Sequence, residues 1–79
     1  MIAKKYKNYF FISIAVKKKV FLGITKTEFI NDTISIDSVN APAKVMDSLA
    51  VKKIQENYEK KLKCPVTILY YIHLASNEN

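Results

Sequence analysis

Seventy-nine residues are enough for one hydrophobic core but not for two, and an apolar content of 49% with a single glycine is typical of a folded chain. One cysteine, Cys64, excludes both a disulfide framework and a zinc site within one chain, and it predicts a reducing, cytoplasmic setting. All 13 basic residues are lysines, against 7 acids, so the net charge of +6 favours an acidic partner: nucleic acid, an anionic membrane surface or an acidic protein. The absence of arginine argues against base-specific DNA recognition.

The first lysines and the apolar run that follows them, residues 10–16, are superficially similar to a signal peptide. Lys17-Lys18-Lys19 stands where a small-residue cleavage site should be, so we interpret the run as a β-strand. No stretch approaches the ~20 apolar residues of a membrane span, and we expect no membrane partner.

The first half of the chain predicts strands. Apolar residues alternate along 9–16, and after the three lysines the alternation resumes at Val20, Leu22 and Ile24. Two strands joined by a lysine-rich turn are expected, and because that turn lacks Gly and Asn, a longer or bulged loop is favoured over a two-residue one.

Asn31-Asp32 is a second turn signal, so a third short strand is expected over 33–37. Pro42 excludes a central strand in the connection that follows.

A helix is expected between an N-cap at Asp47-Ser48 and a stop at Cys64-Pro65. One apolar stripe runs along it, formed by Val51, Ile54, Tyr58 and Leu62. An additional turn over 42–46 would move the apolar positions off this stripe, so a break near Asp47 is favoured.

The last strand, 66–74, alternates clearly. Together these elements predict an α+β fold with a three- to four-stranded, mainly antiparallel sheet (β-β-(β)-α-β, order 3-2-1-4) and one amphipathic helix packed on one face. A right-handed crossover would make the last strand parallel to the first. Residues 1–79 form a single domain, in which 1–8 and 75–79 are expected to fray.

A single helix covers one face of such a sheet, yet the other face is not polar. Its predicted members are Tyr9, Phe11, Phe21, Leu69 and Tyr71. An exposed apolar patch of this kind is commonly a protein contact, either with a partner or with a second copy. The alternative is that the connection containing Val39, Val45 and Met46 folds back and covers it.

Lysines form the second candidate site, for phosphates or an acidic partner: Lys4, Lys5, Lys7, Lys17, Lys18 and Lys19. Lysines at a hairpin end also serve simple solvation and edge protection. Aromatic residues beside lysines are typical of platforms that stack single-stranded nucleic acid, although any core would fill the same strand positions.

No catalytic, metal or cofactor site is predicted. His73 is the only histidine and has no second ligand or triad partner, and Cys64 lies at a helix C-terminus, where the dipole disfavours a thiolate. Gly23 is the only glycine, so a phosphate-cradling loop is excluded.

The hairpin, the single charged helix with its apolar stripe and the closing strand Val66-Thr67-Ile68-Leu69 resemble the small accessory proteins of phages and mobile elements, including anti-CRISPR inhibitors. The resemblance covers most of the chain in size and layout and carries no functional residue. It implies a non-enzymatic protein that acts by protein–protein interaction. The alternative is a small basic regulator that contacts nucleic-acid phosphates through lysines.

Overall fold

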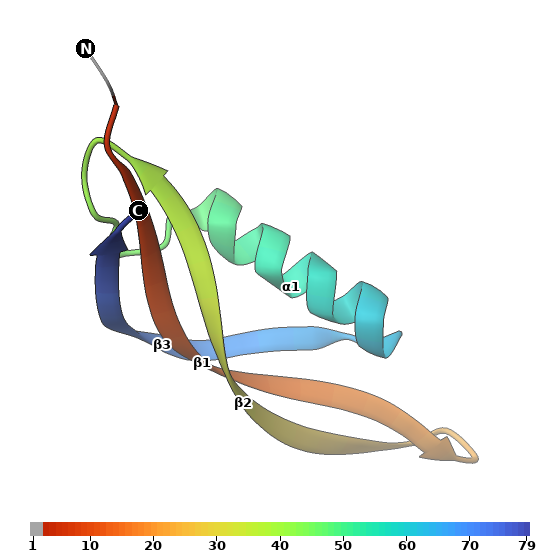
Figure 1. Ribbon diagram of the computed structural model, residues 1–79. Coiled ribbons are helices and arrows are strands. Elements are labelled where there is room, and N and C mark those ends of the chain that lie inside the picture. The colour runs from red at the N-terminus through yellow and green to blue at the C-terminus, as the bar shows by residue number, and fades with distance from the viewer. Residues whose placement is uncertain (1–2) are drawn as a thin grey trace.

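The longest strand, β1 (Lys5–Phe21), is also the central one. A computed structural model describes residues 3–79, and in it β2 (Ile24–Val39) and β3 (Val66–Glu78) both pair antiparallel with β1, giving the sheet order β2-β1-β3. The single helix α1 (Ser48–Leu62) lies across one side of the strands, and Figure 1 shows no element on the other side. The α+β class with a mainly antiparallel sheet is therefore confirmed.

The turn between β1 and β2 lies further along the chain than the lysines predicted. Lys17 to Lys19 stay within β1, and Leu22-Gly23 forms a two-residue turn that places Phe21 opposite Ile24. A bulge at Val20 precedes it. The expected bulge is therefore present, but the turn is not longer than two residues and does not lie at the lysines, because lysines on an exposed ribbon do not break a strand.

The expected third strand is part of β2, so the strand order 3-2-1-4 is also wrong. Asn31 and Asp32 pair with Ser13 and Ile12 in an unbroken ladder. Asp32 accepts a hydrogen bond from the Thr33 amide, the local bond that suggests a turn, while the strand continues. Because the chain does not turn at Asn31-Asp32, the last strand has the opposite direction to the one expected. It runs antiparallel to β1 and not parallel to it.

The helix begins and ends where its capping residues predict. The Asp47 side chain accepts a hydrogen bond from the Ala50 amide at 2.7 Å. Lys63 adopts the left-handed conformation, with its amide bonded to Glu59, and Pro65 follows. The predicted stripe of Val51, Ile54, Tyr58 and Leu62 packs against the core.

The core consists of one row of β1 side chains. Phe10, Ile12, Ile14 and Val16 are fully buried between the sheet and α1, with Met46 and Val66 beside them. Burial of each large apolar side chain contributes roughly 1.5–3 kcal/mol. Alternate residues of a strand point to opposite faces, so this row leaves the odd-numbered residues of β1 on the face away from the helix.

Two bulges in β3 change which of its residues face the helix. Leu69 is an extra residue between Ile68, which pairs with Ile14, and Tyr70, which pairs with Ser13. Leu74 is likewise an extra residue between His73, which pairs with Phe10, and Ala75, which pairs with Tyr9. Each bulge shifts the alternation by one residue. Val66 and Ile68 therefore face the helix, as do Tyr71 and His73 further along.

Asn8 is a fully buried polar residue that ties four segments together. Its amide nitrogen donates to the Ile36 carbonyl and to the Ser38 hydroxyl, both at 2.9 Å. Its oxygen accepts from the Ala43 amide at 3.0 Å and from the Ser76 hydroxyl at 2.6 Å. All four hydrogen-bonding positions of the side chain are filled, which is what burial of an amide requires.

These bonds hold the connection over 40–47 on the helix side of the sheet. Met46 is buried in the core, and its backbone amide donates a hydrogen bond to the Tyr71 hydroxyl on the helix side. Val39 and Val45 remain exposed. The connection therefore does not cover the open face, which rejects the self-coverage alternative.

Both described chain ends take part in the sheet, and the expectation that they fray stays a prediction. Tyr6 lies opposite Glu78, and the Asn79 amide donates to the Lys5 carbonyl. Residues 1 and 2, which belong to the same expectation, lie outside the described residues. Within 3–79, no helix has the length and apolar character needed to cross a bilayer.

The Asn8 network generates a stability prediction. Asn8→Ala leaves the Ala43 amide and two hydroxyls without their partner, so we expect the free energy of unfolding to fall by about 2–3 kcal/mol. Urea denaturation followed by circular dichroism measures this. Asn57→Ala, at an exposed helix position, is the matched control and should change stability by less than about 0.5 kcal/mol. Equal stability of the two variants would contradict the structural role of Asn8.

Candidate functional site: the open face of the sheet

The face of the sheet away from α1 carries an aromatic and aliphatic centre. Tyr9 and Phe11 from β1 lie beside Tyr70 and Ile72 from β3, with Phe11 directly opposite Ile72. The Phe11 and Tyr70 rings are 6.2 Å apart and tilted by 39°. Tyr70 is 52% exposed and Ile72 53% exposed, so this centre is uncovered. We call these four residues the open-face cluster.

The β2 side of the same face is mostly polar. The partners of Phe11, Tyr9 and Ser13 on β2 are Thr33, Ser35 and Asn31. Phe29, opposite Ala15, and Val39, opposite Lys5, are the exposed apolar exceptions. The face is therefore divided along β1 into an apolar half over β1 and β3 and a hydrogen-bonding half over β2.

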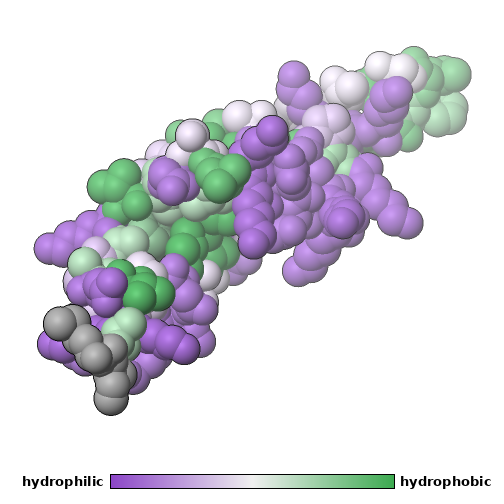
Figure 2. Space-filling model, turned by 90° about the horizontal axis from the view of Figure 1, so that it is seen from above, coloured by the Kyte–Doolittle hydropathy of each residue, from purple (hydrophilic) through white to green (hydrophobic). Residues whose placement is uncertain are grey.

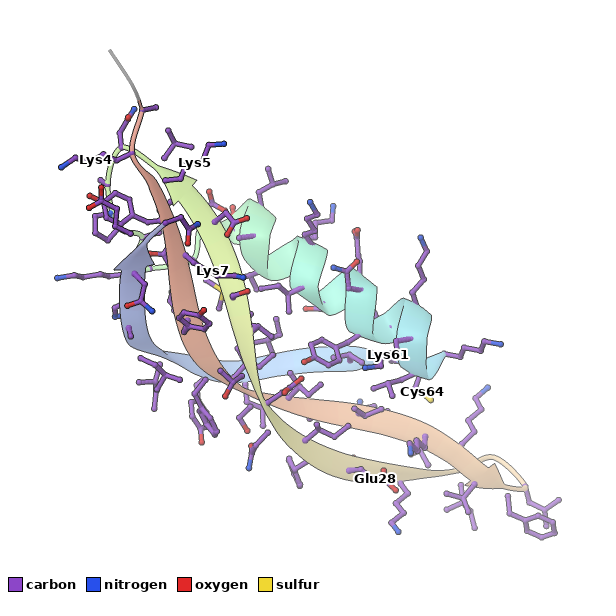
Figure 3. The ribbon with its side chains drawn as sticks, in the orientation of Figure 1. Lys4, Lys5, Lys7, Glu28, Lys61 and Cys64 are labelled. Carbon is purple, nitrogen blue, oxygen red and sulfur yellow. The ribbon has the colours of Figure 1, made fainter. Side chains whose placement is uncertain are left out.

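Lysines lie at both ends of the open-face cluster. Along β1 the same alternation places Lys5 and Lys7 before Tyr9, and Lys17 and Lys19 after Ala15, on this face. Figure 3 shows Lys4, Lys5 and Lys7 gathered at the N-terminal end of β1. The six lysines predicted as one patch are thus two groups, separated by the cluster.

Lys18 points to the helix side and is paired. Its Nζ lies 2.9 Å from the Glu28 carboxylate. The hydrogen bond and charge of Glu28 raise the pKa of Lys18, and Lys18 in turn lowers the pKa of Glu28. Both side chains are solvated, so this pair adds little stability.

Three of the five residues predicted for the open face do not occupy regular positions on it. Phe21 is at the tip of the β1–β2 hairpin, beyond the face. Tyr71 points to the helix side, where its ring stands edge-on to Phe10 at 5.7 Å. Leu69 is exposed, but as a bulge residue. Tyr9 and Phe11 lie on the open face as predicted.

Tyr70, Ile72 and Phe29 were missed. A strand without bulges would place Tyr70 and Ile72 on the helix side, and the alternation of Val66 to Leu74 contains no sign of a bulge. Phe29 could have been found, since Ile30, Ile34 and Ile36 share its strand at even positions and all pack inward.

The histidine and the cysteine both lie in structural contacts. His73 lies edge-on to Phe10, and its Nε2 is 2.8 Å from the Ser76 hydroxyl, which in turn bonds Asn8. Cys64 is half-buried against the core. Across the described part of the chain, no three His, Cys, Asp or Glu side chains converge as metal ligands would.

A polar contact links the helix to the edge strand β2. The Tyr58 hydroxyl donates to the Asp32 carboxylate, which also accepts from the Thr33 amide. These hydrogen bonds lower the pKa of Asp32. Partial burial, followed by the bond to Asp32 and its charge, raises the pKa of Tyr58 to about 12. An inward carboxylate on an edge strand also discourages pairing with another sheet.

Comparison with protein-family models, curated proteins and solved structures gives no match for this chain.

The Tyr58–Asp32 contact predicts a pH dependence. Because the folded pKa of Tyr58 is raised from 10.0, its contribution to stability is complete below that value and is lost as the pH rises toward 12. Asp32 has the opposite sign: its contribution is complete above the unfolded value and is lost as the pH falls through its lower folded pKa.

Titration of tyrosinate absorbance measures the first of these. We expect Asp32→Asn to lower the pKa of Tyr58 but to leave it above 10.0, because burial is the larger cause. Tyr58→Phe identifies its contribution among the 5 tyrosines. An unchanged Tyr58 titration in Asp32→Asn would contradict the contact.

Proposed function

We propose that this protein is a non-enzymatic binding protein whose open-face cluster docks on a partner protein. The observation that carries the proposal is the exposure of Tyr70 and Ile72 beside Tyr9 and Phe11, on a face that no other segment within residues 3–79 covers. Contiguous exposed apolar surface costs solubility, and aromatic residues are enriched at protein interfaces. A stoichiometric inhibitor or an adaptor acts through such a face, and the similarity in layout to small phage-encoded inhibitors favours that mode.

The arrangement of charge favours an acidic partner over a second copy. Sheets stack with their strands within about 30° of one another. If two copies stacked face to face with their β1 strands antiparallel, Lys5 and Lys7 of one copy would lie over Lys17 and Lys19 of the other. With the strands parallel, each lysine group would lie over the same group of the second copy. Like charges in contact disfavour association. A partner with an apolar centre and carboxylates at both ends fits the same surface without repulsion.

Single-stranded nucleic acid is the second candidate, on one specific observation. The aromatic rings of Tyr9, Phe11 and Tyr70 lie on the open face and outside the core, and lysines extend the row at both ends. Bases stack on such rings while lysines contact phosphates.

The first test concerns the cluster itself. A partner is first captured from nuclease-treated host lysate and purified. Phe11→Ser combined with Tyr70→Ser should lower the affinity for this partner by at least about tenfold. Leu49→Ser, an equally apolar and exposed change on the helix, is the control and should bind like the wild type. Isothermal calorimetry gives the affinities, and circular dichroism checks the fold. Undiminished binding by the double variant would refute the proposed site.

The second test separates the partner classes. Lys7→Glu with Lys17→Glu should weaken an acidic protein partner, whereas Lys52→Glu with Lys53→Glu on the helix should not. Anisotropy with labelled oligonucleotides tests the alternative. Four phosphate contacts predict that affinity for single strands falls by about 50-fold between ~50 and ~200 mM salt. Binding that steep, and lost in the cluster variant, would favour nucleic acid over a protein partner.

The third test concerns self-association. We expect a monomer by sedimentation equilibrium at low salt, because the lysine groups repel. A stable dimer at low salt that the cluster variant dissociates would contradict the preference for a different partner.

A further inference from the structure

The β1–β2 hairpin extends as an arm beyond the rest of the fold. The first pair between β3 and β1 is Val66 with Val16, so residues 17–27 form a two-stranded ribbon without β3. Figure 1 shows this ribbon projecting past the ends of α1 and β3, and the molecule is 60 Å long but only 19 and 17 Å across. An isolated two-stranded ribbon is marginal in water, so folding alone does not explain the arm.

The tip of the arm is apolar on all sides. It consists of Val20 (61% exposed), Phe21 (69%), Leu22 (85%) and Ile24 (64%). Figure 2 shows the corresponding hydrophobic end, farthest from the N-terminus. We call these four residues the arm tip. No described residue packs over them as part of the core.

The residue at the turn itself is a poor choice for folding. Leu22 and Gly23 have φ values of 47° and 79°, the left-handed conformation at both central positions of a two-residue turn. Asn and Gly adopt this conformation readily, and Leu does not. Among the described residues, the most exposed large apolar side chain therefore lies where Asn would suit the turn better, which indicates a role outside folding.

Lysines surround the ribbon just behind the arm tip. Lys17 and Lys19 lie on one face, and Lys18 and Lys26 on the other, while Glu28 at the base of the arm pairs with Lys18. At about 3.3 Å per residue, Lys19 lies roughly 10 Å behind Leu22. That spacing matches the roughly 5–10 Å to which apolar groups enter the boundary between lipid headgroups and acyl chains.

We propose that the arm tip inserts into an anionic lipid surface, with the lysines at the level of the headgroups. Lysines on both faces of the ribbon behind an apolar tip fit a planar anionic surface. A protein pocket for the same tip would have to be as deep as the tip is long and acidic around its whole rim. Four large side chains also exceed the one or two that wedge between DNA bases. The inference does not depend on the open-face cluster, and insertion of a hairpin tip requires no membrane-spanning helix.

Co-sedimentation of the full chain with vesicles tests the proposal. We expect binding to phosphatidylglycerol–phosphatidylcholine vesicles and little binding to phosphatidylcholine alone. Leu22→Asn is the decisive variant, because Asn suits the turn and should preserve or raise stability. It should weaken vesicle binding several-fold, and Leu22→Asn with Phe21→Ser at least about tenfold. Leu49→Ser is the matched apolar control, and it should bind like the wild type.

The charge requirement has its own pair of variants. Lys19→Glu with Lys26→Glu should remove the preference for anionic vesicles, and Lys52→Glu with Lys53→Glu should retain most of it. The proposal is overturned if anionic vesicles are not bound, if the tip variants bind like the wild type, or if both lysine pairs weaken binding equally. Loss of vesicle binding in the Phe11 and Tyr70 variant, with normal binding by the tip variants, would assign the contact to the open face instead.

Discussion

One helix of 15 residues can cover only one face of a three-stranded sheet, and most of the molecule follows from that constraint. The even-numbered side chains of β1 fill the space beneath α1 and are fully buried from Phe10 to Val16. The odd-numbered residues of the same strand are therefore fixed on the opposite face. A register slip of one residue would exchange the two sets, so the buried row also determines what the open face displays.

The Asn8 network explains why the chain does not cover this face itself. The connection from β2 to α1 is long enough to fold over an edge of the sheet, but Asn8 binds the Ala43 amide on the helix side. Met46 then enters the core next to Tyr71. If the connection left the helix side, the buried Asn8 side chain would lose its hydrogen bond from the Ala43 amide. A buried polar group without its partner is costly, so the connection stays on that side.

Much of the fold could be predicted from the sequence, and the failures have particular causes. The helix and its stripe were predictable because Asp47, Pro65 and the spacing of Val51 to Leu62 are local signals. The course of β2 was not, because Asn31-Asp32 favours a turn in isolation, whereas pairing with β1 and the Tyr58 contact to Asp32 hold it extended. That one error also reversed the expected direction of the last strand.

The site was predictable only in part for a similar reason. Tyr9 and Phe11 follow from the regular alternation of β1, which has no bulge before Val20. Tyr70 and Tyr71 were exchanged because the bulge at Leu69 depends on packing against β1 and on the Tyr71 bond to Met46, neither of which leaves a local pattern. The same limit applies to the lysines, whose division into two groups requires the full length of β1.

Charge and apolar surface occur together at two places, the open face and the arm tip. In each, lysines border side chains that the fold leaves in water, and neither surface involves His73 or Cys64. The lysines of β1 and of the hairpin thus lie next to apolar surface, a combination that suits binding to an acidic surface with an apolar component.

The central claim is that the bulged β3 presents Tyr70 on an uncovered face and turns Tyr71 to the helix side, where it is partly buried against the core and bonded to Met46. Nitration of the native protein, read residue by residue by tandem mass spectrometry, compares these two neighbours directly. The structure predicts that Tyr70 reacts much faster than Tyr71 and that a bound partner protects Tyr70. Faster reaction of Tyr71, or equal protection of both in the free protein, would contradict the open face.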